Sequence, residues 1–503
     1  MLKNVSSNWI LTLVQIAVTF VLMPFTIRTL GQDQYGTWIL IASLTSYLSL
    51  MALGIPMATV RFVAKFAAGG NQEELDRTVG SCLGLYLLIG VAAMLIGIGL
   101  FFVFRSTYNV PAALRSRADL AFAITVVFIA AGFLGQLPYG IMSAHQDFVI
   151  KNRIQISGFL LRLVLTYVLL KINATMVWLA VIQVTQLTME FSIASWVVAR
   201  RYPRIHIRLS DFDPGMLKQI FSFSLFVLIL QIGGQLAFQT DSLVIGAFRP
   251  VGDIPFFTVA SSLAVYVMEF VIAIAAVVMP LATQLEAKGQ WEELRVVFLK
   301  WSKITLSLTL MVGLFLIFIG PRFIAWWVEP SFESPAGRVL RILMTANLIF
   351  LPMRGVALPI LMGLGRPAWP TVGFLIASVG NLALSIALAG PMGLDGVAWG
   401  TAIPNVLYAL YVLVLACRAV GLPFVTYARY VGVRAALGTV PAVAVLWVLR
   451  YVLNVHGLFQ IFFAGIGFVA VFAAIWVFFV YRRDRYVSLD PLFSRVPLLR
   501  AFA

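Results

Sequence analysis

Charged residues are scarce in this chain. They make up 11% of its 503 residues, hydrophobic residues make up 61%, and the mean hydropathy is +0.98. A soluble chain of this length carries about 25% charged residues. A membrane-spanning helix needs roughly 20 apolar residues, so the chain is long enough for more than a dozen such helices. The composition excludes an ordinary soluble protein and predicts an all-α polytopic membrane protein.

Cysteine and histidine are also rare. The two cysteines, Cys82 and Cys417, lie in hydrophobic segments, where cysteine usually serves as a small packing residue. The three histidines lie in or next to predicted loops, and the sequence has no zinc-ligand spacing, Walker loop or dinucleotide fingerprint. These absences argue against a disulfide framework, a metal site, a bound cofactor and an ATP-driven pump.

The hydrophobic segments predict fourteen transmembrane helices. They cover 9–30, 36–60, 78–104, 119–143, 153–171, 174–199, 217–248, 254–283, 302–328, 338–363, 368–389, 394–417, 433–454 and 458–481. The N-terminus lacks a basic n-region and a small-residue cleavage site, so we expect 9–30 to remain as an uncleaved first helix.

Basic residues alternate between successive loops. The N-terminus and the loops after even-numbered spans hold 24 of them: Lys3, Arg61, Lys65, Arg77, Lys151, Arg153, Arg200, Arg201, Arg204, Arg208, Lys218, Lys288, Arg295, Lys300, Lys303, Arg366, Arg418, Arg429, Arg434, Arg482, Arg483, Arg485, Arg495 and Arg500. The odd-side loops hold nine: Arg28, Arg105, Arg115, Arg117, Lys171, Arg249, Arg322, Arg338 and Arg450. Basic loops stay in the cytoplasm, so both termini are expected there. No basic domain stands apart from the helices, so we expect no nucleic-acid partner.

The chain also repeats itself at an offset of 219 residues. The pattern Gly-x-x-Glu-Glu-Leu at 70–75 recurs at 289–294, in an equivalent even-side loop. The offset relates spans 1–6 to spans 7–12 with the same orientation, because six is even. We therefore expect two pseudo-symmetric six-helix lobes, 1–210 and 211–425, and two extra helices with a short basic tail in 426–503. Parallel repeats of this kind occur in transporters.

Five charged residues lie deep inside the predicted spans. They are Arg162, Glu190, Asp241, Glu269 and Arg354. A charge at bilayer depth costs a few kcal/mol by insertion scales, so such a group faces protein or a watery cavity. Groups of both signs at this depth favour a polar pathway and hence transport.

Polar residues form stripes at helical spacing on three spans. The stripes are Asn8, Thr12, Gln15, Thr19 and Thr26; Gln183, Gln186 and Glu190; and Gln231, Gln235 and Gln239. Hydrogen bonding between helices is the simpler explanation for any single member. Together the stripes favour a cavity, and Gln15, Gln231 and Gln235 are candidate substrate contacts.

Arg162 and Arg354 are the principal candidates for substrate binding. Arg162 lies about ten residues, or roughly 15 Å, inside its span, and two prolines that free backbone carbonyls flank Arg354. Each arginine could bridge a buried acid structurally. The alternative is a cationic patch for an anionic ligand, since the guanidinium fork suits phosphate. Arg28 and Arg61, at helix ends, could guard a cavity mouth, although snorkelling also explains them.

The three carboxyls are candidates for ion coupling. Desolvation favours the neutral form of a buried carboxyl, which can then exchange a proton near neutral pH. Asp241 is the first choice because it borders the glutamine stripe near Gly233 and Gly234, and Glu269 and Glu190 follow. An ion pair with one of the deep arginines is the competing interpretation. The coupling ion would be H⁺ or Na⁺.

Several short motifs resemble those of one transporter family. They are Leu30-Gly31-Gln32-Asp33-Gln34-Tyr35-Gly36, Gly54-Ile55 followed by Arg61, Thr240-Asp241, Gly363-Leu364-Gly365-Arg366, and Gly393 with Gly396-Val397-Ala398. The first resembles the Leu-Gly-x-x-x-Tyr-Gly signature of bacterial polysaccharide flippases, in the multidrug/oligosaccharidyl-lipid/polysaccharide exporter superfamily. The others lie where that family has similar motifs. Val251-Gly252-Asp253-Ile254-Pro255 departs from the Gly-x-Tyr-like segment of relatives.

The resemblance implies a transporter rather than an enzyme, in the bacterial inner membrane. It implies alternating access around a central cavity and export of an oligosaccharide on an undecaprenyl diphosphate carrier. Membrane lipids, a polysaccharide polymerase and other assembly proteins are the implied partners. A lipid II flippase and a drug or cation antiporter remain alternatives. A glycan polymerase or ligase is a further one, but such an enzyme would carry a long periplasmic loop.

The basic asymmetry generates a topology prediction. A reporter fused after Ala503 is expected to be active only in its cytoplasmic form, because the basic even-side loops hold that end inside. Paired cytoplasmic and periplasmic reporters, also fused in the 105–118 loop, provide the opposite-side control. A periplasmic signal from the C-terminal fusion would overturn the orientation.

Overall fold

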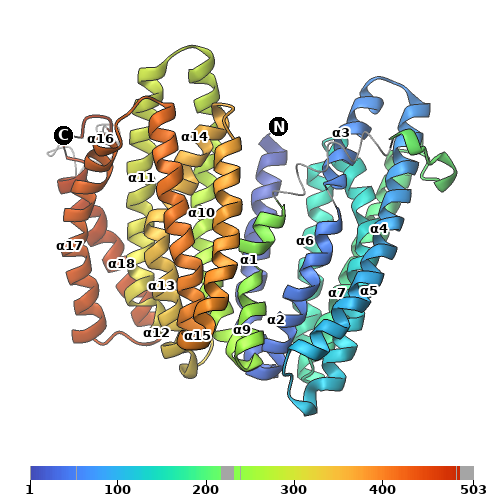
Figure 1. Cartoon of the computed structure of the whole chain (residues 1–503), viewed down its shortest axis with the longest axis horizontal. Coiled ribbons are helices and arrows are strands. Elements are labelled where there is room, and N and C mark those ends of the chain that lie inside the picture. Colours follow the sequence, from blue (N-terminus) through green and yellow to red (C-terminus); the bar gives the residue numbers. More distant parts are fainter. Residues whose placement is uncertain (1, 53, 217–230, 238, 483, 488–503) are drawn as a thin grey trace. The chain divides into compact units, whose positions relative to one another are not determined.

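The computed structural model describes residues 2–52, 54–216, 231–237, 239–482 and 484–487 (Figure 1). Within these ranges the regular structure is entirely helical. Twelve helical segments of the described residues are long and apolar enough to cross a membrane. The predicted all-α polytopic class is therefore confirmed.

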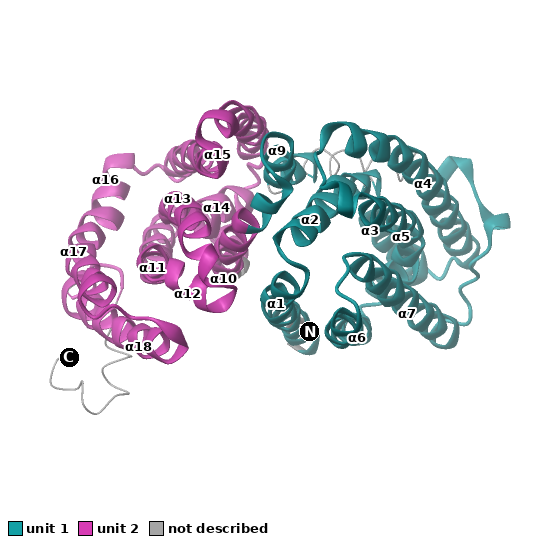
Figure 2. Cartoon of the chain, turned by 90° about the horizontal axis from the view of Figure 1, so that it is seen from below, with its two compact units in different colours: residues 1–255 teal, residues 256–503 magenta. Residues whose placement is uncertain are grey.

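The chain forms two compact units, Met1–Pro255 and Phe256–Ala503 (Figure 2). In unit 1, α1 packs on α6, and α5 packs between α4 and α7. Its elements are α1 (Leu2–Leu30), α2 (Gln32–Ser46), η1 (Tyr47–Ala52), α3 (Ile55–Ala68), α4 (Gln72–Thr107), α5 (Ala112–Ala144), α6 (Phe148–Ile172), α7 (Val177–Arg201), η2 (Leu209–Asp211), α9 (Thr240–Phe248) and η3 (Val251–Asp253).

In unit 2, α13 packs against α11 and α15, and α17 packs against α11 and α18. The elements are α10 (Ile254–Ala287), α11 (Trp291–Phe318), α12 (Gly320–Trp327), η4 (Pro330–Phe332), α13 (Glu333–Pro352), η5 (Met353–Ala357), α14 (Leu358–Gly363), α15 (Ala368–Ala419), α16 (Phe424–Ala428), η6 (Arg429–Val433), α17 (Arg434–Trp447), η7 (Val448–Val452), α18 (Gly457–Ile475) and η8 (Trp476–Val480). This division into two units does not test the predicted lobe limits, which stay a prediction.

The segment labelled α15 is a helical hairpin. Its 52 residues would span about 78 Å if straight, against a hydrocarbon core of roughly 30 Å. Gly393 breaks it with φ 59° and ψ −134°, which a glycine adopts without a steric penalty. The two arms touch where Asn381 Nδ2 donates to Thr401 Oγ1 at 3.3 Å and Tyr411 Oη to the Trp369 carbonyl at 3.5 Å. The arms are therefore antiparallel, as expected for the predicted eleventh and twelfth spans.

The first part of the predicted seventh span, residues 217–230, lies outside the described residues. Its C-terminal part contains helical residues 231–237 and α9. The total of fourteen helices consequently stays a prediction.

Helix ends recur at the predicted offset of 219 residues. The matching positions are Gln32 and Val251, Ala68 and Ala287, Gln72 and Trp291, and Ala144 and Gly363. The left-handed residues recur too: Gly70 (φ 67°) matches Gly289 (φ 69°), and Gln146 (φ 61°) matches Gly365 (φ 64°). The two units therefore share a plan of helix lengths and turns, in agreement with the internal repeat.

Three buried threonine hydroxyl groups are bonded within their own helices. Thr45, Thr59 and Thr125 each donate to the carbonyl four residues earlier, at 2.7–2.8 Å. A hydroxyl in hydrocarbon would otherwise lack a partner, so the helix backbone supplies one. These residues keep the apolar segments compatible with the membrane.

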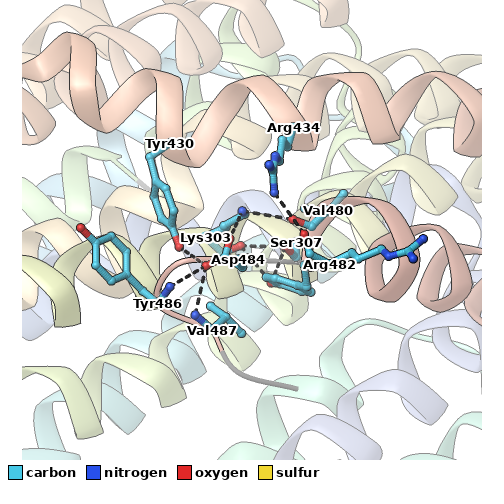
Figure 3. Close-up of polar contacts among 10 residues, drawn as sticks. Lys303, Ser307, Tyr430, Arg434, Val480, Arg482, Asp484, Tyr486 and Val487 are labelled. Carbon is cyan, nitrogen blue, oxygen red and sulfur yellow. Dashed lines mark hydrogen bonds and ion pairs between the residues drawn. The ribbon is translucent and has the colours of Figure 1, made fainter. Parts of the chain in front are cut away.

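An ion pair joins the last helices to α11 (Figure 3). The Lys303 Nζ and the Asp484 carboxylate are in contact, and both side chains are 1% exposed. Tyr430 Oη also donates to Asp484, at 2.5 Å, and Lys303 Nζ lies 4.7 Å from the Tyr430 ring centre. Lys303, counted with the loop residues in the sequence, is thus buried inside a helix. The pair anchors the C-terminal end of α18–η8 to α11 and η6.

The environment of Asp484 favours its charged form. Burial opposes ionisation, but hydrogen bonds from Lys303 and Tyr430 and the Lys303 charge hold the pKa of the carboxyl below its usual range. A lowered carboxyl pKa contributes stability at neutral pH, and this contribution is lost as the pH falls through that pKa.

Removing one partner of this pair is expected to destabilise unit 2. Asp484→Asn leaves a buried ammonium uncompensated, which costs roughly 3–5 kcal/mol, so the thermal midpoint of the protein in detergent should fall by several degrees. Glu292→Gln is the matched control, because Glu292 pairs with Arg295 on the same helix but is 84% exposed. Equal midpoints for the two variants would contradict the anchoring role.

Candidate functional site

Arg162 is a partly buried cation on α6 of unit 1. Its charge interacts with the hydroxyl of Tyr35, on α2. Within the described part of the chain, Arg162 forms no ion pair with a carboxylate. The structure therefore does not pair it with Glu190, the acid carried by neighbouring α7, and its charge is available to an anion.

Arg354 lies in the π-helical turn η5 of unit 2. Four neighbours in that turn are buried, whereas Arg354 itself is partly exposed. A π turn between two α-helical segments interrupts the regular hydrogen-bond ladder and is frequent at functional sites. Arg354 interacts electrostatically with Tyr408 on α15 and, like Arg162, has no ion pair among the described carboxylates. The two deep arginines thus share one environment, a nearby tyrosine without a salt bridge.

Gly355 sets how closely η5 packs on its neighbours. A methyl group at this position would lie 2.9 Å from a Val271 side-chain carbon on α10 and 3.1 Å from one of Thr305 on α11. The glycine allows the turn to sit against both helices. That packing holds the backbone of Arg354 in a defined place. Arg354 belongs to unit 2 and Arg162 to unit 1, and their convergence on one cavity stays a prediction.

Glu190 forms a compact polar cluster between α5, α6 and α7. Tyr139 Oη donates to Glu190 Oε2 at 2.7 Å, and Gln186 Nε2 donates to Oε1 at 2.8 Å. Glu190 is 9% exposed. A methyl group on Gly158 would lie 2.0 Å from Oε1, so only glycine leaves room for the carboxyl. No described cation forms an ion pair with it.

This cluster can hold either protonation state of Glu190. The two neutral donors stabilise a carboxylate, while burial without a cation disfavours its charge. A protonated carboxyl would in turn keep one oxygen as an acceptor. Sequence inspection missed Tyr139 and Gly158, because a tyrosine and a glycine in an apolar run resemble ordinary packing residues. What distinguishes these two residues is their contact with Glu190, and that contact exists only once α5, α6 and α7 pack together.

Asp241 lies in the first turn of α9 and is 8% exposed. A helix N-terminus stabilises negative charge. The adjacent Thr240 hydroxyl bonds the Tyr47 hydroxyl at 2.8 Å, and Tyr47 interacts electrostatically with Asp241. Asp241 therefore belongs to a buried polar contact between η1 and α9, within unit 1.

The other predicted site residues have more open environments. The exposed residues among them are Glu269, Arg28, Arg61, Gln15 and Gln231. Arg61 also lies over the Phe62 ring, 5.7 Å from its centre.

Gln235, the third glutamine proposed as a substrate contact, forms hydrogen bonds with two serines. It accepts from Ser46 Oγ at 3.4 Å and donates to Ser49 Oγ at 3.4 Å. Hydrogen bonding between helices was one of the two explanations that the sequence allowed for the polar stripes, and it applies to Gln235.

A separate pocket of about 600 Å³ opens beside the start of α4. Asp76 and His206 pair across it at 3.1 Å, and the segment 208–214 closes one side. The pocket is lined by the predicted even-side loops and carries both signs of charge. It is thus distinct from the deep positions of Arg162 and Glu190.

The comparisons with known proteins agree with this architecture. Residues 1–286 match the family described as polysaccharide biosynthesis protein. The chain is 23% identical over 460 residues to the uncharacterized membrane protein EpsK of Bacillus subtilis (strain 168), covering 88% of this chain and 87% of that protein.

Solved structures of two transporters share the fold. The inward closed conformation of the lipid II flippase MurJ has a TM-score of 0.71 and 16% identity, covering 96% of this chain and 99% of that one. An inward-facing multidrug resistance MATE family transporter of the MOP superfamily has a TM-score of 0.69 and 18% identity, covering 80% and 94%.

The resemblance drawn from the short motifs is thereby confirmed, and the chain is a multi-pass membrane protein with a transporter fold. With more than half of its length matched by one family model, the chain belongs to the polysaccharide biosynthesis protein family.

Proposed function

We propose that this protein is a flippase of the bacterial inner membrane. It moves an undecaprenyl-diphosphate-linked oligosaccharide from the cytoplasmic to the periplasmic leaflet by alternating access, for surface polysaccharide biosynthesis. The carrying observation is the environment of Arg162 and Arg354, two deep arginines without an ion pair in the described residues of a chain from a polysaccharide family.

The chemistry of the arginines supports a diphosphate ligand. A guanidinium donates two parallel hydrogen bonds that match phosphate oxygens, and it stays charged at membrane depth. A cation without an ion pair at that depth is energetically costly. In a transporter with no use for such a charge, we would expect a neighbouring carboxylate or a neutral residue in its place. Binding of an anionic substrate supplies the missing charge. The glycan itself would be held by neutral polar groups, for which Gln15, Gln231 and Gln235 are the candidates.

A lipid II flippase is the second candidate. The MurJ structure covers 96% of this chain and 99% of its own, and the similarity therefore extends beyond a twelve-helix core into the region of α17 and α18. The family match favours a polysaccharide precursor instead. A drug or cation antiporter and a membrane polymerase or ligase are weaker alternatives. Deleting the gene and identifying the lipid-linked glycan that accumulates would separate these functions.

The deep arginines provide the first functional test. Arg354→Lys keeps the charge but loses the planar fork, so surface-polysaccharide output in a complemented deletion strain should fall about tenfold, the equivalent of one lost charged hydrogen bond. Arg162→Lys should behave alike. Arg117→Lys, at an exposed site on α5, is the control. Wild-type output from Arg354→Lys at equal protein level would leave bidentate recognition unsupported.

Ion coupling by buried carboxyls is the second part of the proposal. Export against a gradient needs an energy source, and a carboxyl that changes charge between inward-open and outward-open states can link H⁺ or Na⁺ to transport. Such a site acts only through its different affinity for the two states. Asp241 is the first candidate and Glu190 is the second, because each is buried beside hydroxyl groups. Glu269 is the third.

Neutral amide variants test the coupling. Asp241→Asn mimics the protonated form, so export should fall at least about tenfold and one conformation should dominate in cysteine-accessibility labelling. Glu190→Gln should keep the Tyr139 contact while removing titration. Glu73→Gln, on an acid with a 75% exposed side chain, is the control. Normal turnover with unchanged pH and sodium dependence in the Asp241→Asn protein would rule that residue out.

A further inference from the structure

Three arginines gather around the C-terminal end of α11 in unit 2. Arg341 Nε donates to the Ile317 carbonyl at 3.2 Å, and Arg450 donates to the Phe318 carbonyl. Arg322 donates to the Val455 carbonyl at 3.0 Å and to Asn454 Oδ1 at 2.7 Å. They come from α12, α13 and η7, so tertiary packing brings together cations that are far apart in the sequence.

The cluster carries more positive charge than its protein partners neutralise. The charge of Arg450 acts on both Arg322 and Arg341, and Glu333 is the carboxyl that opposes it. None of the three arginines forms an ion pair with a described carboxylate. A helix C-terminus supplies the equivalent of about half a negative charge.

Two donor atoms inside the cluster have no partner. Arg322 Nε and Arg450 Nε are buried and make no hydrogen bond within the described residues. Unsatisfied buried donors are rare in proteins, because each forfeits the hydrogen bond that it would make with water. Capping of α11 explains one bond from Arg341 and one from Arg450, but it leaves these Nε groups unexplained. These two atoms are enclosed by the protein, so an anion would instead bind the terminal nitrogens of Arg341 and Arg450 that the capping of α11 leaves unused.

Exposed aromatic side chains surround the cluster. Trp326 is 39% exposed, Trp447 52% and Tyr451 59%, and the rings of Trp447 and Tyr451 lie 5.7 Å apart. Tryptophan and tyrosine concentrate at the boundary between hydrocarbon and headgroups. The cluster lies at the opposite end of α17 and α18 from the Lys303–Asp484 pair, and by the predicted topology this end faces the periplasm.

We propose that Arg322, Arg341 and Arg450 form a binding site for the phosphate of an anionic lipid in the periplasmic leaflet. The guanidinium forks bind the phosphate oxygens, and the aromatic rings hold the glycerol and upper acyl region at the boundary. The site is separate from Arg162 and Arg354 and does not depend on the proposed transport activity.

Lipid binding to the full chain in detergent tests this site. Native mass spectrometry would compare phosphatidylglycerol with diacylglycerol, which has the same tails without a phosphate. Wild-type protein should retain phosphatidylglycerol about tenfold more strongly, as expected for charged hydrogen bonds. Arg322→Gln and Arg341→Gln should each reduce that preference, and the double variant should abolish it. Equal retention of the two lipids by wild-type protein would overturn the proposal without the need for a variant.

Arg338→Gln is the matched control. Arg338 lies on the same helix as Arg341, but it pairs with Asp395 at 2.9 Å and its side chain is 53% exposed. It should keep the wild-type preference, and a loss as large as that of Arg341→Gln would show a nonspecific charge effect and refute the site. In the last experiment, inorganic pyrophosphate is added to the protein in place of the lipid and the thermal midpoint is measured. If it raised the thermal midpoint as much as phosphatidylglycerol, the ligand would be a soluble phosphate and the lipid assignment would be wrong.

Discussion

The rest of this structure depends on one constraint, the absence of hydrogen-bonding solvent in the bilayer core. Every backbone group there needs an internal partner, so the described chain is built from helices. Side chains obey the same rule. Thr45, Thr59 and Thr125 turn back onto their own helix carbonyls, and Ser385 bonds across the α15 hairpin to Asn381 at 3.3 Å. Many polar residues in these apolar segments therefore have a partner in reach, whereas the buried hydroxyls of Thr166, Thr305 and Thr309 make no hydrogen bond among the described residues.

The buried charges meet this constraint in three different ways. Lys303 and Asp484 neutralise each other and bind the last helices to α11. Glu190 has hydrogen-bond donors but no described cation, which suits a group that changes its protonation state. Arg162, Arg354 and the arginines around α11 have carbonyls or tyrosines near them but no described carboxylate partner. The first arrangement is structural, and the other two are the ones on which the proposed coupling and binding sites rest.

The internal repeat explains why the two units resemble each other in outline but not in chemistry. Helix ends and left-handed turns recur at 219 residues, because they are set by backbone conformation and span length. The charged residues deep in the spans do not recur. Arg162 corresponds to Asn381, Arg354 to Gly135 and Glu190 to Ala409. A scaffold duplicated in this way can carry different binding groups in each unit.

The sequence by itself determined the membrane class, the approximate place of most helices, the repeat and the family, although the helix predicted at 302–328 is Trp291–Phe318. These follow from hydropathy, helical periodicity and glycine-rich turns, which are local along the chain and need no knowledge of packing. It also identified Arg162, Arg354, Glu190 and Asp241 as unusual, because a charge in an apolar run is visible in one dimension.

Only the tertiary structure decided which of these groups are paired. Glu190 could not be assigned Tyr139 and Gly158 as neighbours, since they come from α5 and α6. In the sequence Lys303 was counted with the loop residues. Its buried ion pair could not be foreseen, because the partner Asp484 lies 181 residues away. The arginines around α11 were spread over odd-side loops and one helix, and they became one cluster only through packing. Whether a charged group in a membrane protein is neutralised depends on the groups that it contacts in space. The spacing of residues along the chain does not reveal those contacts.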